Sequence, residues 1–204
     1  CIRDSVTLEN FQDALATDKG NNFLRAIGNS LLISLATTAL AVLVGVLAGY
    51  ALARLNFRGK GIVTAIILAA SMFPGIALVT PLFQLFSNIG WIGTYQALIV
   101  PNISFALPLT VYTLISFFKQ LPWELEEAAR VDGASRFTAF RKVLLPLAAP
   151  ALFTTAILAF IATWNEFMLA KQLSTTATEP VTVAIARFSG PSAFESVSYT
   201  HLTL

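Results

Sequence analysis

The stretch SLLISLATTALAVLVGVLAGYAL, residues 30–52, decides the fold of this chain. It lies in a segment from Ala26 to Ala53 that contains no charged residue and exceeds the roughly 20 apolar residues that a membrane-crossing helix needs. Over all 204 residues, hydrophobic residues make up 56% and charged residues 12%, whereas a soluble domain carries roughly 25% charged residues. Much of the apolar surface must therefore face lipid.

Further spans follow from the distribution of charged and turn-forming residues. Residues 61–118 contain no charge, but this stretch is too long for one crossing. It is interrupted by SNIGWIGTYQ, whose glycine and polar residues indicate a turn and divide it into spans near 62–86 and 96–118. A final span runs over about 150–170. We therefore predict an all-α membrane protein, a polytopic helical bundle with about four spans.

The basic residues predict the orientation of these spans. The loops 54–61 and 119–149 hold eight of the 13 Lys and Arg residues, and both fall on the same side of a four-span bundle. By the positive-inside rule these loops are cytoplasmic. The N-terminal segment 1–25 and the segment 171–204 are then external, on either side of a membrane domain over 26–170. Within the first span, Gly45 and Gly49 form a G-x-x-x-G pair, which we interpret mainly as a site of close helix packing.

The loop 119–149 is predicted to form a helix–Gly–helix hairpin. Pro122 and a run of glutamates suit the positive N-terminal end of a helix, which Gly133 ends. Ser135 can cap a second helix, which Pro146 closes. The hairpin is compatible with an amphipathic linker at the membrane surface, a DNA-reading helix-turn-helix, or a docking element for another protein. Its five basic and four acidic side chains neutralise phosphates poorly, which disfavours the nucleic-acid interpretation.

The sequence EAARVDGASRFTAFRKVLLP in this loop resembles the EAA loop of the inner-membrane permease subunits of binding-protein-dependent ABC importers. The pattern is E-A-A, three residues, G, nine residues, then I-x-L-P, with Val replacing Ile here. The flanking spans, and WNEFMLA after them, resemble the carbohydrate branch, the MalG-like subunits of maltose and trehalose importers. This resemblance implies the type I ABC importer transmembrane fold. It assigns an ATPase-coupling loop to Glu127, Ala128, Ala129, Asp132, Gly133, Val143, Leu145 and Pro146.

The resemblance also implies the extent of the chain and its partners. Such subunits usually have six spans, and those visible here match the second to the fifth, so we expect a fragment with a missing last span. The outermost residues resemble read-through tails and not native sequence. The implied partners are cytoplasmic ABC ATPase subunits, a second, MalF-like permease subunit, an extracytoplasmic sugar-binding protein and the lipid bilayer of the bacterial inner membrane. ATP and Mg²⁺ belong to the ATPase, whose closure swings the spans between inward-open and outward-open states.

Little in the sequence favours chemistry by the chain itself. It has one cysteine, Cys1, and one histidine, His201, and it lacks a G-x-x-x-x-G-K-[ST] phosphate loop. We therefore expect no catalytic residue, metal or bound cofactor. Candidate substrate-path residues are Asn102, Trp164, Asn165 and Glu166, since an acidic side chain within or at the edge of a span is a functional candidate by default. For Glu166 an interfacial position, with Trp164 as aromatic anchor, is the equal alternative.

The sequence leaves alternatives open for both the transported solute and the class of protein. Spans without basic residues favour a neutral sugar over an anion. A permease for another solute, such as glycerol phosphate, phosphate or a polyamine, shares the EAA pattern. A membrane-embedded enzyme would need clustered ionisable groups in the spans, and a purely structural membrane anchor would tolerate a scrambled EAA loop.

Overall fold

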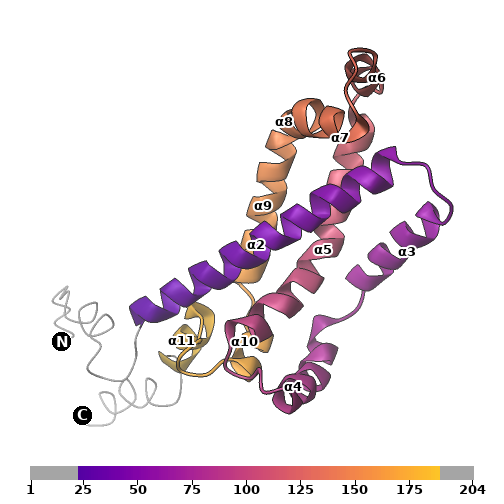
Figure 1. The fold of residues 1–204 in the computed structure, drawn as a ribbon. Helices are drawn as coiled ribbons and strands as arrows, with labels where there is room; N and C mark the ends of the chain where they lie inside the picture. Colours follow the sequence, from indigo (N-terminus) through magenta and orange to yellow (C-terminus); the bar gives the residue numbers. More distant parts are fainter. Residues whose placement is uncertain (1–22, 189–204) are drawn as a thin grey trace, which may run out of the picture. The chain divides into compact units, whose positions relative to one another are not determined.

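The structure, a computed structural model, describes residues 23–188, and its regular elements there are all helical (Figure 1). The described residues form two compact units. Unit 1 contains residues 23–33, 79–98 and 164–188, and unit 2 contains residues 34–78 and 99–163. Most of the predicted external segment 1–25 and the last part of 171–204 lie outside the described residues. The predicted all-α class is confirmed.

Two helices are long and apolar enough to cross a membrane unaided. They are α2, Phe23–Arg54, and α5, Tyr95–Gln120, which correspond to the first and third predicted spans. Helix α5 continues through Pro101 and Pro108, although each proline lacks the N–H that the helix would use. The other two predicted spans are each broken into a pair of helices, so the described part has up to four spans if each pair counts as one.

Each broken span has a sharp bend between its two helices. The second consists of α3, Lys60–Ser71, then η2, Gly75–Leu78, and α4, Val79–Asn88, with the break before Gly75. Pro74 explains this break, because proline disfavours the helical conformation in the residue that precedes it. The fourth predicted span ends early: α9, Ala149–Trp164, stops short of residue 170.

The remaining elements are short. Between α5 and α9 lie α6, Glu124–Val131; α7, Arg136–Ala139; the π-helical segment η3, Phe140–Leu144; and α8, Leu145–Leu147. After α9 come α10, Met168–Leu173, and α11, Val181–Phe188. The helices Arg136–Leu147 and Ala149–Trp164 meet at an angle of 71°. In Figure 1, α6, α7 and α8 lie at the shared end of α5 and α9.

Within unit 2, helix α2 is apolar on its outer face and small or polar on its inner face. Leucine and valine side chains face outward: Leu35, Leu40, Leu43, Val44 and Leu47. The buried face carries small and hydroxyl residues: Ser34, Thr37, Thr38, Ala41, Gly45 and Gly49. Lipid offers no hydrophobic drive for helices to associate, so contacts between spans depend on small residues that let backbones approach.

The G-x-x-x-G pair of α2 lies against α5, which confirms the packing interpretation. A Cβ atom built on Gly45 would lie 2.5 Å from Cγ2 of Thr110, and one on Gly49 would lie 2.9 Å from Cβ of Leu114. The Gly49 position would also approach the backbone N of Ile115 at 3.4 Å. Glycine is therefore needed at both positions because the two helix backbones are too close for a side chain.

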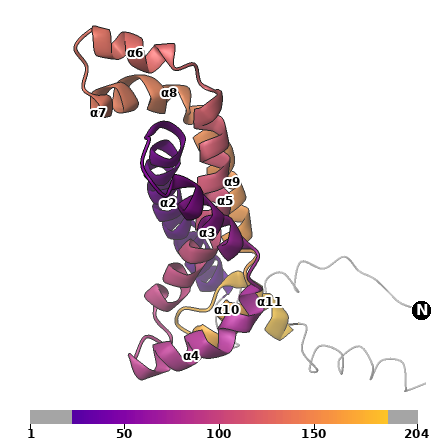
Figure 2. The ribbon, with the colours of Figure 1, turned by 90° about the vertical axis from the view of Figure 1, so that its right-hand side faces the viewer.

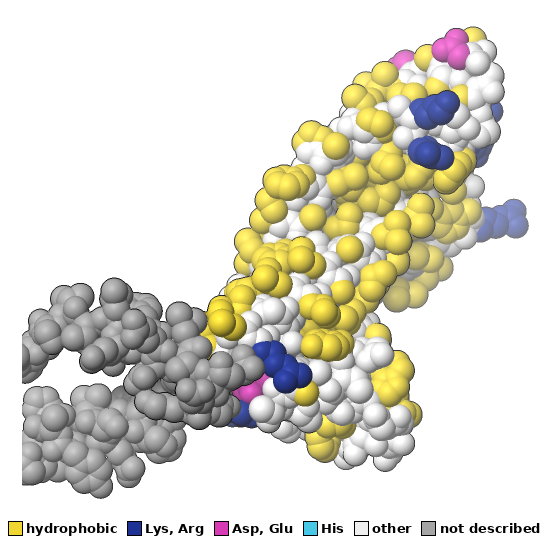
Figure 3. All heavy atoms as spheres, turned by 60° about the vertical axis from the view of Figure 1, so that its left-hand side comes forward, with side chains coloured by type: hydrophobic (Ala, Val, Ile, Leu, Met, Phe, Trp, Pro, Cys, Tyr) yellow, Lys and Arg dark blue, Asp and Glu magenta, His cyan; other side chains and the backbone are white. Residues whose placement is uncertain are grey.

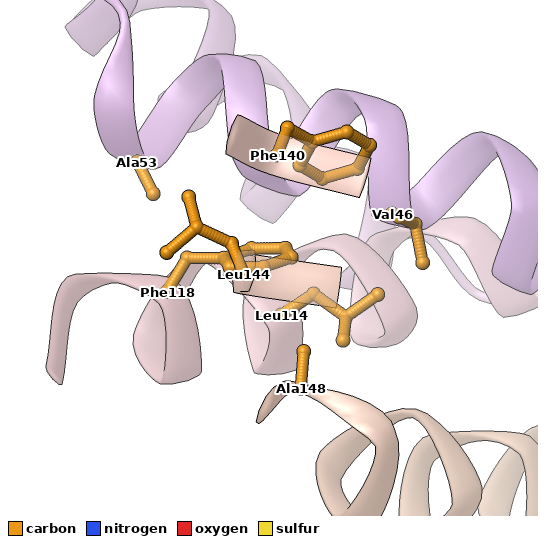
Figure 4. Close-up of a cluster of buried hydrophobic side chains, with 7 residues drawn as sticks. All are labelled: Val46, Ala53, Leu114, Phe118, Phe140, Leu144 and Ala148. Carbon is orange, nitrogen blue, oxygen red and sulfur yellow. The ribbon is translucent and has the colours of Figure 1, made fainter. Parts of the chain in front are cut away.

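The core of unit 2 joins α2 and α5 to the hairpin that follows. Figure 4 shows its seven buried side chains: Val46, Ala53, Leu114, Phe118, Phe140, Leu144 and Ala148. Phe118, Leu144 and Leu114 are fully buried, and the ring of Tyr50 lies 4.5 Å from that of Phe140 between centroids. The hairpin is thus anchored by burial of its own aromatic and aliphatic residues against two spans.

Much apolar surface remains exposed. Figure 3 shows hydrophobic side chains along the spans, with charged side chains at the end that carries the hairpin and in a further group away from it. Helix α3 and η2 bury none of their residues, and Ile62 and Ile66 are more than 60% exposed. Exposed apolar area on this scale indicates contact with lipid or with other subunits.

We predict that Gly49→Ala destabilises the protein while Gly28→Ala, on the same helix, does not. The new methyl group at position 49 forces α2 and α5 apart, and overpacking of this kind costs about 1–3 kcal/mol. At Gly28 a Cβ meets nothing within 4 Å, and alanine favours a helix over glycine by roughly 0.5–1 kcal/mol. Thermal unfolding of the purified membrane protein measures both changes; equal effects of the two variants would contradict the close contact.

Candidate functional site

The first helix of the predicted hairpin, α6, is defined at both ends. Glu124, Glu126 and Glu127 occupy its first turn, where the positive end of the helix dipole stabilises carboxylates. At its C-terminal end the N–H of Gly133 donates to the carbonyl of Arg130, and the N–H of Ala134 donates to that of Ala129. These two bonds form a Schellman motif, and Gly133 has the φ of +87° that the motif requires.

The second half of the hairpin is more irregular than the sequence predicts. Ser135 caps α7 as expected, accepting a hydrogen bond from the N–H of Thr138 at 3.2 Å. The prediction of a single α-helix that continues to Pro146 is wrong, because residues 140–144 form a π-helix. Pro146 explains the wider turn, since it has no N–H to donate to the carbonyl four residues before it. Figure 2 shows α6 returning alongside α7 and α8.

The structure places the residues of the EAA pattern in this one hairpin. On and after α6, the residues Glu127, Ala128, Asp132 and Gly133 are exposed, and Ala129 is half-buried. At the base, Val143 and Leu145 are half-buried and Pro146 is exposed, with Leu145 packed against the core of unit 2. The first half of the pattern therefore forms part of the exposed surface, and the second half anchors the hairpin to the core of unit 2.

The opposite side of α6 is fastened to α2 by polar contacts. The hydroxyl of Tyr50 donates to Oε1 of Glu126 at 3.2 Å, and Nη2 of Arg54 donates to the carbonyl of Leu121 at 2.6 Å. The Arg54 guanidinium also lies 4.5 Å from the ring centroid of Trp123, in cation–π contact. Both side chains of α2 reach the hairpin from one helix face, because they are four residues apart.

Sequence reasoning missed this fastening. From the sequence, Arg54 is only a positive charge of a cytoplasmic loop. Glu126 is only one of the glutamates that suit the N-terminal end of a helix. A usable signal was present: a tyrosine and an arginine at i and i+4 at the end of a span place two hydrogen-bond donors together at its polar boundary.

In unit 1, Glu166 lies just before helix α10. Its Oε1 accepts from the N–H of Leu169 at 2.8 Å and its Oε2 from the N–H of Ala170 at 3.0 Å. The hydroxyl of Thr182 donates to the backbone carbonyl of the same residue at 3.0 Å. The carboxylate thus satisfies two N–H groups at a helix start, which gives it a structural role.

A second polar cluster in unit 1 holds the segment before α11. The Asn29 amide donates to the carbonyls of Ala177 and Glu179, at 3.1 and 2.9 Å, and accepts from the Tyr95 hydroxyl at 2.8 Å. The N–H of Val181 donates to the Ser30 hydroxyl at 2.8 Å. The start of α2 is thus joined to residues about 150 positions later in the sequence and also to the start of α5.

The predicted substrate-path residues fall in both units: Asn102 in unit 2, and Trp164, Asn165 and Glu166 in unit 1. None of them lines the open groove of about 490 Å³ between α5 and α9 in unit 2. Its lining is aromatic, hydroxyl and amide in character and includes Tyr112, Thr113, Ser116, Phe117, Gln120 and Thr154. The four path residues stay predictions.

The hydroxyl groups on this groove bond to their own helices. Thr113 donates to the carbonyl of Leu109 at 2.8 Å, and Ser116 to that of Tyr112 at 3.0 Å. Thr154 donates to the carbonyl of Pro150 at 3.0 Å. These hydroxyls are therefore already hydrogen-bonded within their own helices. Among the described residues, no three His, Cys, Asp or Glu side chains gather as a metal site would require.

Comparison with known proteins identifies the family. Residues 41–197 match the family of binding-protein-dependent transport system inner membrane components. The chain belongs to this family. It is thus a multi-pass inner-membrane permease component and not an enzyme, which confirms the predicted family and membrane location. ATP hydrolysis in such systems is carried out by a separate subunit.

Two relatives of this permease carry names for sugar systems. It is 49% identical over 195 residues to the trehalose transport system permease protein SugB of Mycobacterium tuberculosis, covering 95% of this chain and 70% of the relative. It is 44% identical over 185 residues to the trehalose/maltose transport system permease protein MalG of Thermococcus litoralis, covering 90% and 66%. The chain thus spans about two thirds of the length of each relative.

Solved structures show the same fold at lower identity. A bacterial ABC transporter involved in the import of the acidic polysaccharide alginate matches with a TM-score of 0.70 and 24% identity, over 87% of this chain and 64% of the other. The inward-facing MetNI methionine ABC transporter matches with a TM-score of 0.69 and 20% identity, over 91% and 90%. The predicted ABC importer transmembrane fold is confirmed.

One pH-dependent prediction follows from the polar cluster of unit 1. Glu179 is 7% exposed, and burial raises the pKa of its carboxyl, an effect that Arg187, 3.0 Å away, partly offsets. A raised pKa means that ionisation costs stability, so this cost is absent below the ordinary pKa of the carboxyl and complete above its folded-state pKa. Stability associated with this residue therefore falls as the pH rises through that window.

Removing Arg187 removes the offset, so the pKa of Glu179 rises further. We predict that Arg187→Gln loses more thermal stability than the wild type between mildly acidic and neutral buffer. Glu179→Gln should remove this part of the pH dependence altogether. Melting temperatures of the three proteins in both buffers measure the effect, and parallel pH profiles in all three would contradict it.

Proposed function

We propose that the chain is the permease subunit of an ATP-driven importer for neutral sugars of the trehalose and maltose type, and that its EAA hairpin docks on a cytoplasmic ATPase. The observation that carries this proposal is the hairpin itself: Glu127, Ala128 and Gly133 of the pattern are exposed, while Leu145 packs against the core of unit 2. The names of the relatives SugB and MalG favour the sugar class.

The exposed surface of α6 suits close docking of a partner. Val131 is 87% exposed although apolar, and it lies beside the small residue Ala128 and the exposed turn at Gly133. Small residues permit close approach of another backbone, and an exposed apolar side chain gains from burial in a cleft. Glu127 adds a carboxylate that can pair with a basic group of the ATPase.

The hairpin is also built to transmit force. Its far side is fixed to α2 through Tyr50 and Arg54, and its base is buried in the core of unit 2. Displacement of the hairpin by a closing ATPase pair would therefore move α2 and α9 and not merely bend a loose loop. We propose this displacement as the drive for alternating access.

A neutral solute is favoured by the groove between α5 and α9. Its lining contains aromatic rings, hydroxyls and an amide, and no charged side chain. Such groups stack on sugar rings and bond to sugar hydroxyls, whereas an anionic or cationic solute would call for a countercharge. We propose that the groove forms part of the solute path.

Further partners complete the proposed assembly. The exposed apolar faces of α3 and η2 suit contact with lipid and with a second, MalF-like permease subunit. An extracytoplasmic sugar-binding protein would deliver the solute, in keeping with the binding-protein-dependent family. Permeases for glycerol phosphate or polyamines, and a non-transport membrane anchor, remain the competing assignments for the experiments below.

We predict that Ala128→Trp in the full-length protein abolishes co-purification of the ATPase and sugar uptake. The indole group would occupy the exposed surface where the ATPase must approach, without touching the core. Arg58→Trp is the matched control, since Arg58 is exposed in the loop between α2 and α3. Retention of the ATPase by Ala128→Trp would contradict docking on this face and would favour the membrane-anchor interpretation.

We also predict the class of solute. Proteoliposomes containing the assembled transporter and its binding protein should accumulate labelled trehalose or maltose in an ATP-dependent manner. Excess glycerol phosphate or spermidine should not compete. Competition by either of these, with no uptake of a disaccharide, would replace the sugar assignment by the corresponding solute.

A further inference from the structure

Two opposite charges are buried where α2 meets the hairpin. Arg54, the last residue of α2, is 4% exposed, and Glu126, on the inner face of α6, is 6% exposed. The neighbouring charged residues Arg58 and Glu124 are exposed. Arginine and glutamate are seldom buried unless paired, because removing a charge from water costs several kcal/mol.

The two charges are only partly satisfied. Arg54 uses Nη2 for the Leu121 carbonyl, and Glu126 uses Oε1 for the Tyr50 hydroxyl. Buried Nε and Nη1 of Arg54, and buried Oε2 of Glu126, have no hydrogen-bond partner within the described residues. Nor do the two side chains form an ion pair with each other in that part of the chain.

The unused atoms are complementary. The guanidinium has free N–H groups on Nε and Nη1, and the carboxylate has one free oxygen and a second held only by a neutral hydroxyl. Guanidinium and carboxylate groups form strong charge-assisted pairs. Tyr50 contacts Glu126, and Arg54 lies one helical turn farther along α2. A displacement of α6 along α2 by about one helical turn, roughly 5.4 Å, would therefore exchange the hydroxyl of Tyr50 for the guanidinium of Arg54.

We propose that Arg54 and Glu126 are positioning residues that act as a two-position coupling pair. They stay apart in the present arrangement and join directly when the closing ATPase pair displaces the hairpin. Formation of the pair stabilises the displaced hairpin and carries its movement to α2. This inference rests on the proposed docking of the ATPase, and it adds the element that holds the two hairpin positions.

The test uses the assembled full-length transporter, its ATPase and its binding protein in proteoliposomes. The measured quantities are sugar uptake, ATP hydrolysis, and their ratio, for Arg54→Gln, Glu126→Gln and the double variant. Each single change leaves one buried charge without a partner, so uptake should fall by about tenfold or more. Arg58→Gln is the matched exposed control, outside the hairpin, and should leave all three quantities unchanged.

The double variant distinguishes a pair from two independent anchors. If the residues act on each other, uptake by the double variant stays within about twofold of the worse single variant, because neither charge is left alone. If the two losses multiply, the residues act separately and the proposal is wrong. The ATPase must co-purify with the wild type in either case; if it does not, the proposed docking has failed and not the pair.

Tyr50→Phe provides a second readout, which also serves if the charge variants do not assemble. Removing this hydroxyl frees the Glu126 carboxylate for Arg54, so the displaced hairpin becomes more populated. ATP hydrolysis without the binding protein should then rise severalfold, whereas Glu126→Gln lowers it. A merely structural hydrogen bond would give a decrease in both variants, and that result would overturn the proposal.

Discussion

Close approach of α2 and α5 is the constraint on which the rest of unit 2 depends. Gly45 and Gly49 leave no room for a side chain between the two helices, so their backbones fix the distance at which the remaining residues must pack. In a lipid environment this contact relies on dispersion and shape, since hydrocarbon surrounds the outer faces in any case. Leu35, Leu40, Leu43 and Leu47 of α2 accordingly face outward, and its buried face carries Ser34, Thr37, Thr38, Gly45 and Gly49.

The hairpin between α5 and α9 is held rigid by its packing against this pair of helices. Phe140 and Leu144 of the hairpin and Phe118 of α5 share one buried cluster with Val46 and Ala53 of α2. A docking surface on an isolated loop would deform when a partner displaced it. A surface that is packed against a close-packed core transmits the displacement to that core. In the mechanism that we propose, the exposed part of α6 meets the ATPase and the buried base of the hairpin carries the movement to the spans.

The sequence was sufficient for the class of fold, the long spans and the hairpin, because each depends on local signals. A charge-free run predicts α2, and the acidic first turn and Gly133 predict the two ends of α6. The break before Gly75, the end of α9 at Trp164 and the π-helical turn before Pro146 were missed, since they depend on which backbone groups find partners nearby. The hydrogen bonds of Tyr50 and Arg54 reach residues 76 and 67 positions away. A tyrosine and an arginine at i and i+4 indicate two donors at the end of a span, but not which residues accept from them.

The hydroxyl groups on the open faces of α5 and α9 matter for a protein whose helices must exchange neighbours when they move. The hydroxyls of Thr113, Ser116 and Thr154 each donate a hydrogen bond to a carbonyl of their own helix, so they need no acceptor from a neighbouring segment or from water. Neighbouring segments can therefore move across these faces without depriving any of the three hydroxyls of its hydrogen-bond partner.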